Sequence, residues 1–379
     1  MTGSDAPVWE DGSWTPLPAL AGDVKADVCV IGLGGSGLTA VDELLSRGAR
    51  VVGIDAGSVA GGAAGRNGGF LLAGLAHPHH RVVAQVGRDR AARLHALTLA
   101  EMERIAVTAP ETVRRTGSLR IEDTAEGRAD CAAQAAGLRA DGFAVEEYDG
   151  DEGHGLLFPG DGVLQPLARC RGLTRTLLRR GASLHEGTPA ITIRRGRVDT
   201  PTGNVACDAV IVCVDGGLGR LLPELAPVVR PVRLQMLATA PTHEVSVSRP
   251  VYLRDGYEYW QQLPDGRVAV GGFRDVGGAD EETEDSSPTA PVQAAIERLL
   301  RERIGVSAPV TARWAATVGY TRSGLPFVGQ VRDGVLAAGG YCGTGNVVGA
   351  LCGRALAALA LGEMAAELLL VEVCAQVNR

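Results

Sequence analysis

ADVCVIGLGGSG occupies residues 26–37 and decides the fold of this chain. Its first half, residues 26–31, is a short apolar run of the kind that forms a buried parallel strand. Glycines follow, and residues 38–47 then place apolar side chains at helical spacing. A second apolar run over residues 49–54 ends at Asp55. This order predicts a β-α-β unit with two parallel strands.

The glycines of residues 32–37 follow the pattern G-x-G-x-x-G, which holds the pyrophosphate of a dinucleotide when it joins a strand to a helix. Gly32 is expected to make the tight turn, Gly34 to let the pyrophosphate approach, and Gly37 to let the helix pack on the strand. The helix N-terminus offers free N–H groups and a positive dipole end to the phosphates. Asp55 stands where an acid can bind the ribose hydroxyls of an adenosine. The dinucleotide contacts expected here are Gly32, Gly34, Gly35, Ser36, Gly37, Asp55 and Ala56.

The rest of the chain alternates strands and helices around one antiparallel insert. Residues 57–69 are glycine-rich and predict no regular structure, and residues 277–291 predict an acidic loop. Helices are expected at 91–115, 167–180, 292–304 and 346–362, and strands at 182–186, 190–194, 209–214 and 335–338. Residues 232–275 alternate apolar and polar side chains around two Asp-Gly turns, which predicts antiparallel sheet. We therefore expect an α/β fold with a Rossmann-type parallel sheet and a discontinuous α+β substrate domain with antiparallel sheet.

The two expected domains interleave along the chain. The dinucleotide domain is predicted to comprise residues 24–105, 155–231 and 313–379, and the substrate domain residues 106–154 and 232–312. Residues 1–23 are expected to form an N-terminal extension.

Composition narrows the class of protein. The chain has 379 residues, 45% hydrophobic and 21% charged, which suits a globular enzyme. The net charge of −7 argues against nucleic acid or an anionic membrane as the partner. No run approaches the about 18 apolar residues of a membrane span, and the acidic N-terminus does not resemble a secretory signal, so we expect a cytoplasmic protein. Lys25 is the only lysine, which argues against Schiff-base chemistry, and the eight cysteines show no metal-site spacing, so no metal is expected.

A second glycine-rich segment carries a family resemblance. Residues 61–69 read GGAAGRNGG and resemble the second glycine segment of the D-amino-acid-oxidase superfamily, in its gamma-glutamylputrescine oxidase-like and glycine-sarcosine oxidase-like branch. The resemblance continues through Trp9, residues 163–189, the Tyr259-Trp260 pair, residues 314–326 and the glycine loop at 339–345. It implies that the dinucleotide is FAD.

The resemblance also implies which residues hold FAD. Residues 62–69 would wrap the ribityl and pyrophosphate, with Arg66 as a phosphate or flavin partner or, alternatively, a surface arginine. The segment before residue 190 would contact adenine, and the C-terminal glycine loop would point a helix N-terminus at the flavin. The residues expected in these roles are Gly62, Ala63, Arg66, Asn67, Gly68, Gly69, Pro189, Ala190, Gly216, Gly340, Gly343, Thr344, Gly345 and Asn346. Val318 stands where some relatives carry a tethering cysteine, so FAD is expected to be non-covalent.

The substrate pocket is expected to use tyrosines and arginine. Tyr257, Tyr259, Tyr320 and Tyr341 lie in segments that should line the flavin face, although ordinary sheet packing explains them equally well. Tyr257 and Tyr259 are expected on one face of one strand. Arg274 and Arg322 are candidate carboxylate partners, with a solvated surface role as the alternative. His77, His79 and His80 are close in sequence, and we assign them no metal.

The predicted reaction is the oxidation of a primary or secondary amine or an amino acid. Hydride transfer to flavin N5 would give an imine that water hydrolyses, with oxygen reduced to hydrogen peroxide. The alternatives are an FAD-dependent dehydrogenase of a 2-hydroxy acid or amine with another electron acceptor, and a non-catalytic FAD-binding protein. A hydroxy acid needs a base, usually histidine, and residues 244–379, which are expected to supply most of the pocket, contain none. Ala269 replaces the oxygen-activating lysine of related enzymes, and the particular amine, its stereochemistry and the oligomeric state stay open.

Overall fold

The computed structural model describes residues 5–378. A six-stranded sheet has the order β10-β3-β2-β14-β21-β20. Its strands are β2 (Val28–Ile31), β3 (Val51–Ile54), β10 (Ser183–His185), β14 (Ala209–Val212), β20 (Phe327–Arg332) and β21 (Val335–Gly339). All pairs are parallel except β20 with β21. Every residue of β2, β3 and β21 is buried, as parallel strands covered on both faces require.

Helices and a small sheet cover the two faces of this sheet. Helices α1 (Gly35–Ser46), α6 (Pro166–Arg179) and α10 (Ala350–Leu361) share one apolar core with Val28 and Val30 of β2. Cys29 and Ile31 point to the opposite core, which the four-stranded sheet shares. That sheet has the order β1-β13-β12-β11 and comprises β1 (Val24–Lys25), β11 (Thr192–Arg194), β12 (Arg197–Thr200) and β13 (Gly203–Ala206). The alternation of β2 therefore places the sheet between two layers.

A second, eight-stranded sheet has the order β19-β15-β18-β17-β16-β6-β8-β7. Its strands are β6 (Ser118–Ile121), β7 (Glu146–Gly150), β8 (Gly153–Phe158), β15 (Arg230–Thr239), β16 (Val251–Leu253), β17 (Glu258–Gln262), β18 (Val268–Gly272) and β19 (Val310–Tyr320). Its pairs are antiparallel except β6 with β16. One face packs on α9 (Ala290–Arg298), and the other carries Arg120, Tyr252 and Tyr259 in direct cross-strand register.

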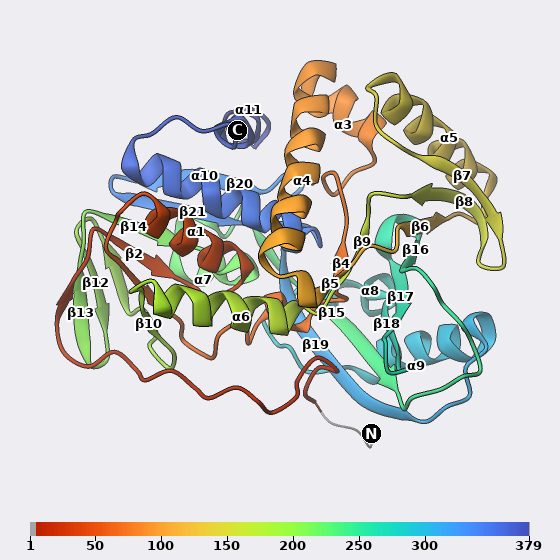
Figure 1. Cartoon of the computed structure of the whole chain (residues 1–379), viewed down its shortest axis with the longest axis horizontal. Helices are drawn as coiled ribbons and strands as arrows, with labels where there is room; N and C mark the ends of the chain where they lie inside the picture. Colours follow the sequence, from red (N-terminus) through yellow and green to blue (C-terminus); the bar gives the residue numbers. More distant parts are fainter. Residues whose placement is uncertain (1–4, 379) are drawn as a thin grey trace.

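The remaining elements connect the two large sheets. They are the three-stranded sheet of β4 (Phe70–Leu71), β5 (Val113–Arg114) and β9 (Gly162–Leu164), and the helices α2 (Ala63–Arg66), α3 (His79–Val86), α4 (Arg88–Thr108), α5 (Ala125–Ala140), α7 (Leu218–Leu221), α8 (Arg274–Gly277) and α11 (Leu368–Val377). Figure 1 shows α1, α6 and α10 on the left, α5 and α9 on the right, and α4 between them. The expected fold class, a parallel Rossmann-type sheet with a further antiparallel sheet, is confirmed.

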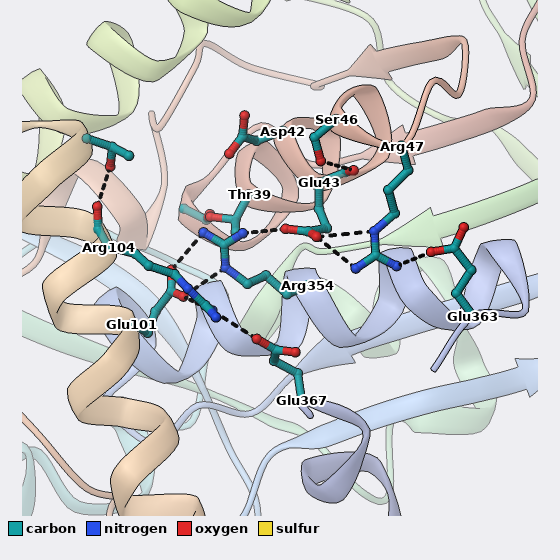
Figure 2. A network of polar contacts seen from close by, with 12 residues as sticks. Thr39, Asp42, Glu43, Ser46, Arg47, Glu101, Arg104, Arg354, Glu363 and Glu367 are labelled. Carbon is teal, nitrogen blue, oxygen red and sulfur yellow. Dashed lines mark hydrogen bonds and ion pairs between the residues drawn. The ribbon is translucent and has the colours of Figure 1, made fainter. Parts of the chain in front are cut away.

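A network of ion pairs ties α4 to the helices of the six-stranded sheet (Figure 2). Arg354 of α10 donates to Glu43 of α1 and, over 2.8 Å from Nε, to Glu101 of α4. Arg104 donates to Glu101 and to Glu367, over 3.1 and 2.9 Å. Because each of these carboxylates has an arginine partner, the charges can stay buried between the helices.

Some expected elements differ from the structure. The helix expected at 91–115 is α4, which ends at Thr108, because Pro110 cannot continue it and a 3-10 turn and β5 follow. Residues 57–69 do contain one helical turn, α2, so the expectation of no regular structure was wrong there. The helices expected at 292–304 and 346–362 combine α9 and α10 with π turns at Leu299–Ile304 and Gly345–Gly349. Four expected domain boundaries fall inside elements, namely α4, β8, β15 and β19, and the domain division stays a prediction.

Residues 5–378 contain neither a candidate membrane span nor a cluster of metal ligands. None of their helices combines the length and the apolar composition that a membrane crossing needs. They also contain no group of three or more His, Cys, Asp or Glu side chains placed to hold a metal ion.

Candidate active site

A cavity of about 1040 Å³ is lined by residues of both the six-stranded sheet and the eight-stranded sheet. One end is lined by the turn before α1, with Gly34 and Ser36. The other end is lined by residues of β6 and β16, with Arg120 and Tyr252. The cavity is therefore long enough to adjoin both the expected dinucleotide site and the expected substrate sheet.

The three glycines of the fingerprint have different surroundings. Gly32 has a φ of +96°, and a Cβ there would collide with the carbonyl oxygen of Cys213. A Cβ on Gly37 would collide with the carbonyl oxygen of Gly32, so Gly37 serves the packing of α1 and does not line the cavity. Gly34 lines the cavity, and a Cβ there would meet only Ala64, at 3.2 Å. Gly34 is also the N-cap of α1 without a side-chain cap, which leaves the first N–H groups of the helix for an anion.

Asp55 lies where the fingerprint predicts the ribose-binding acid. Its Oδ2 accepts from the backbone N–H of Leu33 over 2.7 Å, and its Oδ1 from that of Gly57 over 2.8 Å. Burial raises the pKa of Asp55, and no cation is bonded to it among the described residues. Each carboxylate oxygen keeps a lone pair for a ligand hydroxyl.

Arg66 lies on the wall of the cavity with its charge unpaired. Its Nε donates to the carbonyl oxygen of Ala315 over 2.8 Å, and its Nη2 to that of Asp5 over 3.0 Å. Burial lowers the pKa of Arg66. Because carbonyls hold the guanidinium and no described residue forms an ion pair with it, Arg66 can serve a phosphate or a developing negative charge.

Two tryptophans and an asparagine pair hold the second glycine segment. Trp9 Nε1 donates to the carbonyl oxygen of Asn67 and Trp314 Nε1 to that of Arg66, each over 2.8 Å. The side chains of Asn67 and Asn346 donate to each other over 3.1–3.2 Å. The second glycine segment and the C-terminal glycine loop are thereby joined across the cavity.

Asp215 is a positioning residue that the sequence reasoning missed. Its carboxylate accepts from the backbone N–H groups of Gly319 and Gly340 over 2.9 and 2.8 Å. Burial raises its pKa to about 6, against the effect of these bonds. Asp215 follows β14 as Asp55 follows β3, at the same edge of the parallel sheet, and this place in the pattern could have identified it.

The predicted tyrosines do not form one group. Tyr259 and Tyr320 line the cavity, and the ring of Tyr259 lies edge-on to Phe70 at 5.9 Å. Tyr341 also lines the cavity, but its hydroxyl donates to Ser36 over 2.9 Å and joins the C-terminal loop to α1. Tyr257 precedes β17 in a helical conformation, so the expectation that it shares a strand face with Tyr259 was wrong.

The candidate arginines lie outside the cavity lining. The guanidinium of Arg274 lies over the rings of Tyr257 and Tyr320, at 3.9 and 4.7 Å, and has no carboxylate partner among residues 5–378. Arg322 is exposed.

Most of the predicted FAD contacts line one cavity. Those that do are Gly32, Gly34, Gly35, Ser36, Asp55, Ala56, Gly62, Ala63, Arg66, Asn67, Gly68, Pro189, Ala190, Gly343, Thr344, Gly345 and Asn346. Gly37, Gly69, Gly216 and Gly340 do not line it. A Cβ on each of these four would collide with neighbouring residues, so their local role is close packing.

The end of the cavity that is lined by Arg120, Asp161, Tyr252 and Asp255, which we call the far wall, was not expected from the sequence. Arg120 is 2% exposed and donates to Glu122, Asp130 and Asp255 over 2.8–3.1 Å. Asp161 is 4% exposed and accepts from the Ser118 hydroxyl over 2.6 Å. An arginine inside the apolar run of β6 was the available signal, because a buried arginine requires acidic partners.

Three histidines also line the cavity, namely His77, His79 and His95. The expectation that residues 244–379 supply most of the pocket was therefore incomplete. His79 is bonded to Asp141 over 2.7 Å. Burial lowers the pKa of His95 to about 4, which makes it a weak base.

The arrangement fits FAD. The uncapped N-terminus of α1 suits a pyrophosphate, Asp55 suits a ribose, and Arg66 brings an unpaired cation to the wall. Val318 lines the cavity where a tether could stand in relatives, but Cys342 lines it as well, with a pKa raised by burial. FAD bound here would adjoin both Tyr259 and Tyr320.

Comparison with known proteins places these features in a family context. The model of a family of FAD-dependent oxidoreductases, DAO, matches residues 27–359. The probable oxidoreductase OrdL of Rhizobium meliloti is 29% identical over 376 residues, covering 92% of this chain and 86% of that protein. Gamma-glutamylputrescine oxidoreductase of Escherichia coli is 25% identical over 391 residues, covering 92% and 87%. The structure of glycine oxidase from Geobacillus kaustophilus has a TM-score of 0.75 at 20% identity and covers 90% of this chain and 96% of that one, which shows the shared fold.

Proposed function

The chain belongs to the DAO family of FAD-dependent oxidoreductases, and from this premise we propose that it oxidises a primary or secondary amine, amino acids included. Two relatives support the substrate class by their names, a gamma-glutamylputrescine oxidoreductase and a glycine oxidase. The bound FAD would supply the two-electron acceptor for the C–H bond beside the nitrogen. The protein must then bind the amine, orient it and keep water away.

The charges on the cavity wall formed by the eight-stranded sheet and α5 favour an amine substrate over an anionic one. Arg120 is the only arginine or lysine among the cavity-lining residues of the eight-stranded sheet and α5, within the described chain. It is already bound by Glu122, Asp130 and Asp255. A carboxylate would find no free cation on this wall, whereas an ammonium group would find unpaired acid.

The aromatic side chains next to the second glycine segment provide the orienting surface. A Cβ on Gly68 would lie 3.2 Å from the ring of Tyr259, so this ring borders the segment expected to hold the flavin. Phe70 and Tyr320 extend this surface. An aromatic surface of this kind can hold the alkyl part of an amine and exclude water, and the reaction needs no strong protein base once the amine is neutral.

A 2-hydroxy acid is the second candidate substrate, because histidines do line the cavity. His95 has a pKa of about 4 and is too weak a base for this reaction. His77 and His79 also line the cavity, and the bond from His79 to Asp141 would strengthen that histidine as a base. Anaerobic mixing of the holoenzyme with monoamines, diamines, amino acids and 2-hydroxy acids tests the choice. Amines should bleach the flavin absorbance; bleaching by hydroxy acids alone would contradict the proposal.

Oxygen is the proposed electron acceptor, with hydrogen peroxide as product, and a separate acceptor is the alternative. Ala269 is fully buried in the core beside the cavity and offers no cation. Arg66 lines the cavity with an unpaired charge and is the cation we propose for this half-reaction. Arg66→Met at saturating FAD should slow stopped-flow reoxidation by oxygen and leave anaerobic reduction unchanged; equal reoxidation rates would assign the cation elsewhere.

FAD is proposed to be held without a covalent bond. Acid precipitation should leave a colourless pellet and release FAD. Among the described residues, Cys170, Cys213 and Cys342 line the cavity. Cys342 alone of these three is not buried, so Cys342→Ser is the control if the pellet stays yellow. A yellow wild-type pellet that turns colourless in this variant would replace the proposal with a Cys342 tether.

A further inference from the structure

The far wall of the cavity combines a cross-strand row with two acids. Tyr259, Tyr252 and Arg120 are direct neighbours on β17, β16 and β6. Two strand spacings, about 10 Å, therefore separate Tyr259 beside the second glycine segment from Arg120. Asp161, from the turn between β8 and β9, and Asp255 line the same end.

Acidic groups outnumber basic groups at this end. Four carboxylates gather there: Glu122, Asp130, Asp161 and Asp255. The guanidiniums bonded to this group are those of Arg120 and Arg81, and Arg81 reaches Asp130 and Asp255 from the exterior. His80 is also bonded to Asp130. The excess negative charge faces the cavity through Asp161 and Asp255.

Asp161 in particular has no cationic partner among residues 5–378. Its Oδ1 accepts from the backbone N–H of Ala73 over 2.9 Å, and its Oδ2 from the hydroxyl of Ser118 over 2.6 Å. Both donors are neutral, and each oxygen keeps a lone pair. A buried carboxylate is costly unless a cation or several hydrogen bonds compensate it, so this position is suited to a ligand that brings a positive charge.

Tyr252 supplies a second, independent feature. Its hydroxyl has no hydrogen-bond partner among the described residues, and the partly exposed side chain lines the cavity. Electrostatic coupling to Asp161, Arg120 and Asp255 places it among the charged groups. At this point of the wall the hydroxyl is therefore available to donate to or accept from a ligand in the cavity.

We propose that this far wall binds a second cationic group of the substrate, so that the preferred amine is a diamine or carries a comparable cation at its far end. The inference rests on the proposed amine oxidation and adds its substrate class. The reacting amine would lie beside Tyr259, and the second cation would lie against Asp161 and Asp255, with Tyr252 between them.

The first experiment compares diamines with monoamines of equal carbon number, from three to eight carbons, by anaerobic flavin reduction of the holoenzyme. The apparent dissociation constant of the best diamine should be at least about tenfold lower than that of its monoamine, the size of one charge-assisted hydrogen bond. Asp161→Asn should bring the two within about threefold. Asp141→Asn is the control, since the Asp141 side chain is 5% exposed, is bonded to His79 and Arg88, and does not itself line the cavity.

The second experiment does not depend on turnover. Pentylguanidinium keeps its charge and pentylurea is its neutral isostere, and binding of either to the oxidised holoenzyme is followed by the flavin absorbance. The cation should bind at least about tenfold more tightly, and Asp161→Asn should remove the difference. Asp255→Asn is a second variant in case Asp161→Asn does not fold, because asparagine tolerates the left-handed backbone of residue 255, with φ of 55°.

The outcomes separate this inference from the proposed function. Flavin reduction by monoamines and diamines with equal affinity would overturn the far-wall subsite and leave amine oxidation standing. Asp161-dependent binding of pentylguanidinium without reduction by any amine would do the reverse. Equal binding of pentylguanidinium and pentylurea to the wild type, or a preference that survives both variants, would also overturn the subsite.

Discussion

Glu101 and Asp161 are both buried carboxylates, 1% and 4% exposed, but their surroundings differ. Glu101 lies between α4 and α10, where Arg104 and Arg354 donate to it (Figure 2). Asp161 lies at the end of the cavity and accepts only from a hydroxyl and a backbone N–H. Burial raises the pKa of Asp161 to about 7.

This contrast distinguishes buried charges that stabilise helix packing, as at Glu101, from a buried charge that is available to a ligand, as at Asp161. A buried ion pair satisfies both partners and holds helices in register. A buried carboxylate without a cation destabilises the fold unless something else compensates it, and such sites concentrate at functional cavities. The following predictions test this distinction, from the largest expected effect to the smallest.

Removing the shared arginine should have the largest effect on stability. Arg354→Met leaves Glu43 without one arginine and Glu101 with Arg104 alone, between packed helices. We expect the free energy of unfolding to fall by about 3–5 kcal/mol, because Glu43 and Glu101 each lose one of their two arginine partners between packed helices. Urea unfolding of the holoenzyme measures this, with Arg50→Met at an exposed pair as the control. A loss below about 1 kcal/mol would show that the network is not structural.

Removing the unpaired carboxylate of Asp161 should raise the free energy of unfolding, by an amount that depends on pH. The pKa of Asp161 is raised in the folded protein, so folding binds its proton more tightly and wild-type stability decreases as pH rises from about 4 through 7. Asp161→Asn lacks this dependence. Its advantage over the wild type should grow by up to about 4 kcal/mol between pH 4 and pH 8.

Unfolding at saturating FAD across this pH range measures the difference. Glu101→Gln is the control from the paired network, and it should be destabilised at pH 8. A constant difference between Asp161→Asn and the wild type would mean that the carboxylate is already compensated in the folded protein.

Asp55 tests the same distinction at the opposite end of the cavity. Its carboxylate also accepts only from backbone N–H groups, and we assign its ligand as the ribose of FAD. Asp55→Ala should weaken FAD binding by about 1–3 kcal/mol through loss of a charge-assisted hydrogen bond. Quenching of FAD fluorescence on binding to apoprotein measures the affinity, and Asp161→Asn, which lies at the other end, should retain it. Unchanged affinity in Asp55→Ala would place the adenosine elsewhere.

The smallest expected effects on the free energy of unfolding are those of removing the hydroxyls of Tyr341 and Tyr252. Tyr341 donates its hydroxyl to Ser36, so Tyr341→Phe should cost about 1 kcal/mol of unfolding free energy. The hydroxyl of Tyr252 has no partner in the described chain, so Tyr252→Phe should change stability by less than about 0.5 kcal/mol. Thermal unfolding of both variants compares them. Equal losses would mean that Tyr252 has a partner that the far-wall inference does not include.

Sequence reasoning succeeded wherever local pattern controls the chain. The β-α-β unit, the glycine turn and Asp55 lie within 30 residues, and their apolar periodicity and glycine spacing admit few folds. It failed at Tyr257, because the left-handed residues Arg254 and Asp255 interrupt the strand alternation. It also missed Asp215, whose partners Gly319 and Gly340 lie more than 100 residues away.

The sequence by itself determined the dinucleotide fold, its family resemblance and the residues of its two glycine segments, because backbone turns and helix starts depend on neighbouring residues. Only the tertiary structure decided what the far wall of the cavity contains. Arg120, Asp161 and the pair of Tyr252 and Asp255 come from three separate segments, and sheet pairing across β6, β16 and β17 brings them together. Whether a buried carboxylate meets an arginine, as Glu101 does, or a cavity, as Asp161 does, depends on such long-range pairing and not on its local sequence.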